Sequence, residues 1–82
     1  MSVSIRDIIE SNIHVYPNPT ESILIVQSKN EIVGLELLDT RGKLMISNSH
    51  NNTLDLSSLN AGIYLLKIET ENGISTKKIL VD

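Results

Sequence analysis

The sequence predicts an all-β fold, a small antiparallel β-sandwich of about seven strands joined by Greek-key connections. Three observations predict it. From His14 onward, short apolar runs are separated by turn residues at short spacing. Apolar and polar residues alternate in several of these runs, which is typical of half-buried strands. No helical pattern lies between them, so the chain lacks the long crossovers that parallel pairing requires.

The composition is compatible with one small domain. The chain has 82 residues, no Trp, no Phe and no Cys, so its core must be built from Ile, Leu and Val. A domain of this size buries only somewhat more than roughly 60% of its unfolded surface. The β-branched share of the apolar residues favours strands.

The first residues differ from the rest of the chain. Residues 1–14 are expected to be a linker or a short helical segment, and residues 15–82 the folded domain. Ser4 and Asp7 form an approximate capping pattern, and three isoleucines between Ile5 and Ile9 fall on one helical face. The start lacks the basic and apolar regions of a signal peptide. If the domain is exported, we expect its signal upstream, in a longer precursor.

Seven strands follow in order. Their expected ranges are residues 13–16, 22–27, 33–38, 44–47, 53–56, 62–70 and 75–81. Asn72-Gly73, between the last two, is a strong hairpin signal. Residues 23–26 are apolar on both faces, which predicts a central strand, or one whose second face is covered by the N-terminal segment or a partner. The last strand ends on three apolar residues, so its inward face stays undecided.

The loop between the first two strands is built around Pro17, Asn18 and Pro19. The two prolines remove backbone donors and force the residue before each to be extended. Strand pairing is therefore expected to end here, at a rigid corner. A rigid surface loop also loses little entropy on binding, so this corner is a candidate for recognition.

Residues 39–43 (Asp-Thr-Arg-Gly-Lys) predict a tight turn. Asp39 can accept hydrogen bonds from the backbone that follows it, and Gly42 can supply a positive φ. A ligand-binding pair of Asp39 and Arg41 is the alternative to this structural interpretation.

The spacing of Leu59, Gly62 and Tyr64 is that of a tyrosine corner. In immunoglobulin-like sandwiches such a Tyr, near the start of a strand, bonds back to the backbone of its own corner. Gly62 would let the backbone bend and Leu59 would close the end of the core. The predicted sandwich is therefore immunoglobulin-like.

Lys77 and Lys78 are a basic pair in the second half of the last expected strand. Two interpretations are open for this pair. Lysines on an edge strand discourage unwanted strand addition, and the same edge is where another protein could add a strand.

No catalytic or cofactor site is expected. His14 and His50 have no second ligand at metal spacing, and no Ser lies in a nucleophile elbow. The net charge is −3 and the basic residues are scattered, which argues against nucleic-acid binding. The apolar runs are too short to span a membrane as a helix.

Taken in order, the Pro-Asn-Pro corner, the Asp39 turn, the Tyr64 corner and the basic pair with its aliphatic end resemble the C-terminal sorting domain of the type IX secretion system. This family is one of β-sandwiches at the tail of secreted proteins. In the family, the last strand is implicated in recognition. Asp82 stands where family members often place a lysine, which reverses the charge at that position.

The resemblance implies a transport signal and not an enzyme. It implies that the domain crosses the inner membrane unfolded with an upstream cargo domain and folds in the periplasm. The outer-membrane translocon and its shuttle proteins would then bind it. A sortase-like peptidase would cut it off, and can join the cargo to lipopolysaccharide, so the cargo would be secreted or held at the cell surface.

Two other functions fit parts of the sequence. An immunoglobulin-like adhesion or carbohydrate-binding module would have the same fold, but it would have only Tyr16 and Tyr64 as aromatic contacts. A structural spacer would tolerate changes at Lys77 and Lys78 without loss of transport.

Overall fold

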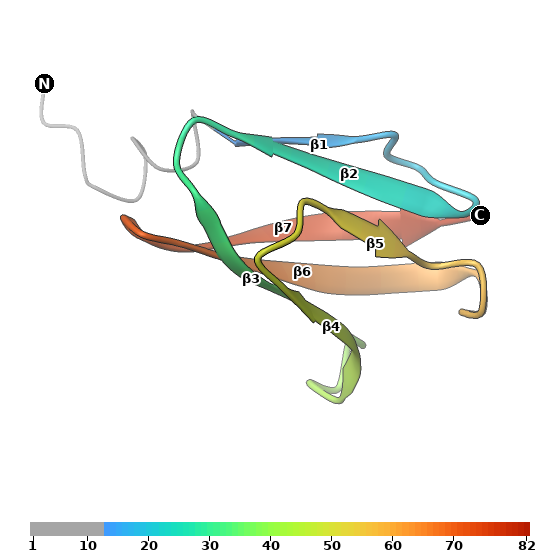
Figure 1. Ribbon diagram of the computed structural model, residues 1–82. Coiled ribbons are helices and arrows are strands. Elements are labelled where there is room, and N and C mark those ends of the chain that lie inside the picture. Colours follow the sequence, from blue (N-terminus) through green and yellow to red (C-terminus); the bar gives the residue numbers. More distant parts are fainter. Residues whose placement is uncertain (1–12) are drawn as a thin grey trace, which may run out of the picture.

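The computed structural model describes residues 13–82, which form seven strands in two layers (Figure 1). The strands are β1 (Ile13–Tyr16), β2 (Ile23–Ser28), β3 (Ile32–Leu38), β4 (Leu44–Ser49), β5 (Thr53–Asp55), β6 (Gly62–Thr70) and β7 (Gly73–Val81). The expected helical segment before Ile13 lies outside the described residues. Within them there is no helix, and so none that could cross a membrane.

One layer is a three-stranded sheet in the order β1-β2-β5, and the other is a four-stranded sheet in the order β4-β3-β6-β7. All neighbouring strands in both sheets pair antiparallel. The chain passes from one sheet to the other after β2, β4 and β5. The all-β sandwich predicted from the sequence is confirmed.

The core lies between the two sheets and is aliphatic, with one tyrosine. Its buried members alternate with exposed residues along most strands, as the side-chain period of two requires. They are Ile13, Leu24, Val26, Leu35, Leu37, Leu54, Leu56, Tyr64, Leu66, Ile68, Ile79 and Val81. Removing aliphatic surface of this kind from water is the main stabilising contribution to such a fold.

The strand with two apolar faces is β2, which lies between β1 and β5 as the middle strand of its sheet. Leu24 and Val26 point into the core, while Ile23 is exposed and Ile25 is half-buried. The central position predicted for this run is correct, and its second face is only partly covered.

The longest element is the hairpin of β6 and β7, which pairs without a break from Gly62 opposite Val81 to Thr70 opposite Gly73. Gly73 closes the turn with a φ of 139°, in a region that favours glycine. Ile79 and Val81 point inward and Leu80 outward, which settles the inward face that the sequence left undecided.

Candidate functional site

The Pro-Asn-Pro corner lies against the last strand. The side chain of Asn18 bonds to β7 at both of its polar atoms: its Nδ2 donates to the carbonyl of Lys78 at 3.1 Å. Its Oδ1 accepts from the backbone amide of Leu80, also at 3.1 Å. An asparagine side chain offers an acceptor and donors on one group, much as a peptide unit does. Asn18 therefore continues the sheet by one short step beyond β7.

Thr20 extends this contact with its backbone. Its amide donates to the carbonyl of Leu80 at 2.9 Å, and its carbonyl accepts from the amide of Asp82 at 2.9 Å. Thr20 thus forms a parallel bridge with Val81. Its hydroxyl donates to the carbonyl of Ile23 at 3.1 Å, and the residue is buried.

The expectation that strand pairing ends at the prolines is therefore wrong in part. Pairing with β2 ends at Tyr16, but the corner then crosses to the other sheet and pairs with β7. Figure 1 shows the loop after β1 at the same end of the molecule as the end of β7. The bridge can be parallel because Thr20 and Val81 are far apart in the sequence, so the strands between them supply the long connection that parallel pairing requires. Both X–Pro peptide bonds of the corner are cis.

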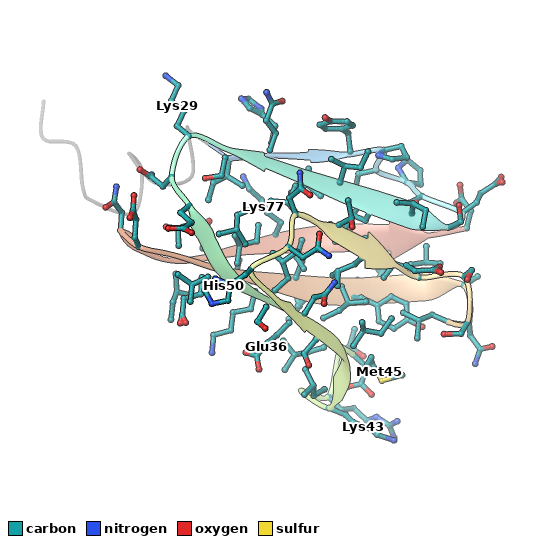
Figure 2. The ribbon with its side chains drawn as sticks, viewed as in Figure 1. Lys29, Glu36, Lys43, Met45, His50 and Lys77 are labelled. Carbon is teal, nitrogen blue, oxygen red and sulfur yellow. The ribbon has the colours of Figure 1, made fainter. Side chains whose placement is uncertain are left out.

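Lys77 and Lys78 lie on opposite faces of β7, which is an edge strand of its sheet. Lys78 is exposed on the outer face, opposite Leu65 of β6. Lys77 is half-buried and shares its face with the buried residues Ser75 and Ile79. Figure 2 shows Lys77 on the side of β7 that faces the three-stranded sheet. The basic pair thus presents one charge on each side of the same edge.

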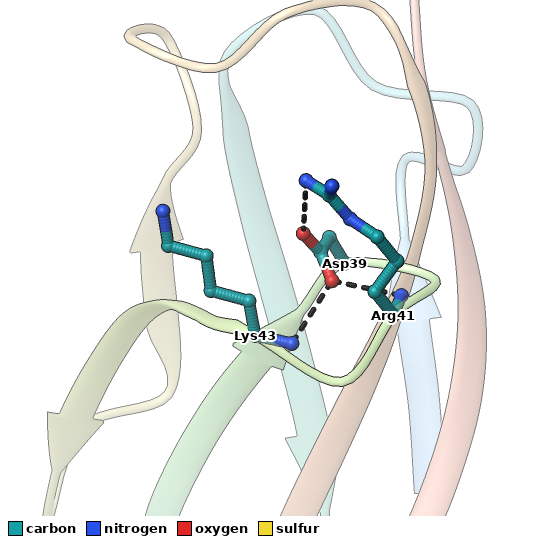
Figure 3. A network of polar contacts seen from close by, with 3 residues as sticks. All are labelled: Asp39, Arg41 and Lys43. Atoms are coloured by element: carbon teal, nitrogen blue, oxygen red, sulfur yellow. Dashed lines mark hydrogen bonds and ion pairs between the residues drawn. The ribbon is translucent and has the colours of Figure 1, made fainter.

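The turn after β3 is organised by Asp39 (Figure 3). Its Oδ1 accepts from the amides of Arg41 at 2.8 Å and Lys43 at 2.9 Å, and its Oδ2 lies 3.5 Å from the Arg41 guanidinium. The amide of Lys43 is the main cause that lowers the pKa of the Asp39 carboxyl below its usual value, followed by the amide and charge of Arg41. Gly42 has a φ of 89°. These contacts are those of a turn, in which residues of the same loop engage both carboxylate oxygens of Asp39.

The bond expected of a tyrosine corner is present. The hydroxyl of Tyr64, at the start of β6, donates to the carbonyl of Asn60 at 2.7 Å. The residue is only 7% exposed, so the bond pairs the polar group of a largely buried side chain. Leu59 packs half-buried against the core, and Gly62 begins β6 opposite Val81. This corner holds the start of β6 in place beside the end of β7.

A second aspartate stabilises the loop that leads into this corner. Oδ1 of Asp55 accepts from the amide of Ser57 at 3.0 Å. Hydrogen bonds from the hydroxyl and the amide of Ser57, in that order, lower the pKa of the Asp55 carboxyl. Local bonds of this type order the loop and need no ligand.

No cluster of metal-ligating side chains appears in the described part of the chain. Among residues 13–82, no three His, Asp or Glu side chains come close enough to hold a metal ion. His50 is exposed in the turn before β5, with a φ of 53°.

Two hollows lie away from the corner. One, of about 450 Å³, is on the outer face of the four-stranded sheet, above the small residues Gly34, Ser47 and Ser49. The other, of about 460 Å³, is beside β2 and is lined by Tyr16 together with Asn51 and other polar groups. Both are shallow, and neither encloses a buried charge.

Sequence reasoning did not identify Thr20 and Leu80 as partners. Both belong to segments that it singled out, but nothing in either segment tells which strand the other will meet. Of the recognition candidates Pro17, Asn18 and Pro19, the central Asn18 bonds to Lys78 in the folded domain, and Lys77 lies on the other face of the strand.

Comparison with known proteins gives a clear family. A family model described as the secretion system C-terminal sorting domain matches residues 14–82, which is most of the chain and nearly all of the described domain. No curated protein matches the chain. The family model covers nearly all of the residues that form the two-layer sandwich. The chain belongs to the family of C-terminal sorting domains of the type IX secretion system.

Proposed function

We propose that this domain is a sorting signal that marks a cargo protein for type IX secretion and acts through that secretion system, as its family implies. The cargo is accordingly a secreted or cell-surface protein. The family is one of sorting signals and not of catalytic domains.

We propose that the outer-membrane translocon and its shuttle proteins recognise the end of the sandwich where the corner meets β7. One observation carries this proposal: Asn18 bonds to both Lys78 and Leu80. The two segments suspected of recognition are about sixty residues apart in sequence and form one continuous surface in the fold. A partner can therefore read both at once, and only when the domain is folded.

The route to this recognition is also part of the proposal. The cargo and its tail cross the inner membrane unfolded, and the tail folds in the periplasm. The surface that the corner and β7 form together exists only in the folded domain. The translocon would therefore bind the tail only after the tail has folded.

A sortase-like peptidase then removes the domain and can attach the cargo to lipopolysaccharide. The cut is expected before β1. Ile13 is buried and β1 pairs with β2 along its length, so a cut between Ile13 and Tyr16 would require part of the sheet to open. N-terminal sequencing of the released tail should find its start at or before residue 13.

A transport assay tests the proposal. The full chain is fused behind a signal peptide and a reporter that fluoresces in the periplasm, in a host with this secretion route and in the same host without the translocon. We expect reporter outside the cell only in the first strain. Reporter retained in the periplasm of both strains, with the domain folded, would contradict the proposal.

The hollow beside Tyr16 is where the alternative function, a carbohydrate-binding module, would have its site. Tyr16 is exposed there next to asparagine side chains, whereas Tyr64 is buried and cannot stack on a sugar. Calorimetric titration with glycans distinguishes this function, because saturable heat lost in Tyr16→Ala would favour it.

A further inference from the structure

The outer edge of β7 is divided into a covered part and an open part. In an antiparallel pair, the N–H and C=O groups of alternate residues point away from the partner strand. The bonds from Asn18 and Thr20 show that Lys78 and Leu80 point their groups outward. Because β6 and β7 pair without a register shift, Thr76 and Ile74 point outward as well.

The open part runs from Ile74 to the amide of Lys78. The amides of Ile74, Thr76 and Lys78 have no backbone partner within residues 13–82, and neither do the carbonyls of Ile74 and Thr76. Such a row of unpaired groups is a template for one more strand. Asn18 closes the row at one end and the β6–β7 turn closes it at the other, so the open row has room for only a short strand.

We propose that the open edge of β7 from Ile74 to Lys78 binds a short extended segment of a secretion-machinery protein, which adds to the sheet as a strand and carries acidic side chains. This rests on the proposed function and names how the partner binds. Main-chain hydrogen bonds to an added strand supply affinity, and alternate side chains supply specificity.

The charges on β7 indicate the chemistry of the partner. Neither Lys77 nor Lys78 has an ion-pair partner among the described residues; the pairs found there are Arg41–Asp39 and Lys67–Glu36. With one lysine on each face of the edge, an added strand meets a positive charge whichever way its side chains point. Carboxylates at neighbouring positions of that strand satisfy both charges.

The same charges argue against a second copy of this chain as the occupant. Two β7 edges paired antiparallel about a two-fold axis at Thr76 would make the Lys77 side chains of the two copies diagonal neighbours on one face. Like charges placed across a strand pair are destabilising. The lysines thus disfavour pairing with a copy of the domain and favour pairing with an acidic strand. Both interpretations of the sequence, protection of the edge and strand addition by another protein, then hold together.

The opposite edge of the sheet provides a matched control. One line of paired residues crosses the sheet from Thr76 of β7 through Lys67 and Glu36 to Ser47 of β4. Thr76 and Ser47 are therefore equivalent positions on the two edges of the sheet. The bond from the His50 amide to the Val33 carbonyl indicates that Ser47, too, points its amide outward. β4 carries no charged residue from Leu44 to Ser49.

Proline at each position tests the edge directly. Thr76→Pro and Ser47→Pro each remove an outward amide that the sheet itself does not use, a change that edge strands can accommodate. In the transport assay, with the full chain, we expect Thr76→Pro to lower external reporter about tenfold through lost bonds and the bulk of the ring. Ser47→Pro should stay within about twofold of the parent. Melting curves establish that each variant is folded.

A charge reversal keeps the test valid if Thr76→Pro fails to fold. The double variant Lys77→Glu/Lys78→Glu leaves the backbone edge intact but repels an acidic strand, and external reporter should fall about tenfold or more. Lys77→Arg/Lys78→Arg should transport within about twofold, because the charges remain.

The outcomes separate the two proposals. If the parent chain is exported and folded Thr76→Pro is exported as well as Ser47→Pro, the strand-addition site is wrong and the sorting role stands. If the charge reversal transports normally, the acidic partner is wrong. If the parent chain is not exported in a translocon-dependent way, the proposed recognition and this inference both fail.

Discussion

The side-chain oxygen of Asn18 accepts a hydrogen bond from the backbone amide of Leu80 at 3.1 Å, across 62 positions of the sequence. With the second bond, to the carbonyl of Lys78, it holds the proline corner against the last strand. A motif at the start of the domain and a strand at its end are thereby made into one surface. The stability of that surface can be measured apart from transport.

Asn18→Ala removes both bonds to β7. Net contributions near 1 kcal/mol per hydrogen bond, reduced by exposure, give an expected loss of about 1–2 kcal/mol in the free energy of unfolding. Urea denaturation measures it. Asn52→Ala is the control, because Asn52 is exposed and its side chain makes no hydrogen bond to residues 13–82. Equal stability of the two variants would show that the corner is not held through Asn18.

Tyr64→Phe tests the tyrosine corner. It removes the hydroxyl that donates to the Asn60 carbonyl from a buried side chain, so the free energy of unfolding should fall by about 1 kcal/mol or somewhat more. Tyr16→Phe removes the same hydroxyl from a side chain that is 45% exposed, and should change stability by only a few tenths of a kcal/mol, roughly. Thermal or urea unfolding of both variants measures these changes. A similar loss of unfolding free energy in each would contradict a special role for the Tyr64 hydroxyl.

Ser75→Ala should change stability in the opposite direction. The Ser75 hydroxyl is buried and has no hydrogen-bond partner among the described residues. Replacing it by a methyl group removes a desolvated polar atom, so the free energy of unfolding should rise, by about 1 kcal/mol. Thr20→Val is the contrast: the buried Thr20 hydroxyl is bonded to Ile23, and its removal should be destabilising. A destabilised Ser75→Ala would show that the hydroxyl has a partner in solution.

Acid should unfold the domain partly through Asp39. Its carboxyl has a lower pKa in the folded state than the ordinary value of 3.8, so the unfolded state binds the proton more readily. The stabilisation is fully present above that ordinary value and is lost as the pH falls through the lower folded pKa. Asp39→Asn keeps an acceptor for the amides of Arg41 and Lys43 but does not titrate. Its free energy of unfolding should decline less steeply than that of the parent below about pH 4, in urea titrations at successive pH values. Parallel curves would contradict this role.

Much of the fold could be predicted because it is encoded locally. The alternation along residues 62–70 placed Tyr64, Leu66 and Ile68 in the core, and Asn72-Gly73 marked the hairpin that forms there. The turn at Asp39 likewise depends on bonds across four residues or fewer. Such features depend on side-chain period and on neighbouring backbone, both of which the sequence shows directly.

The candidate site was less accessible to prediction. Prolines correctly indicated where β1 stops pairing with β2, but they also suggested that pairing ends altogether, whereas Thr20 bridges to Val81. The inward face of the last strand could not be chosen between Leu80 and its neighbours. Ile79 and Val81 are inward because β6 pairs in a register that faces Tyr64 to Ile79.

The sequence by itself determined the strand-rich class, the turns, the tyrosine corner and the motifs that resemble a sorting domain. Only the tertiary structure decided that the corner covers one part of the β7 edge, that the rest of this edge from Ile74 to the amide of Lys78 is unpaired among residues 13–82, and that Lys77 and not Lys78 lies on the inward face. The physical reason is that alternation fixes which side of a strand a residue occupies but carries no information about its neighbour across the sheet. That neighbour is chosen by hydrogen bonds between distant segments, and these form only when the whole core packs.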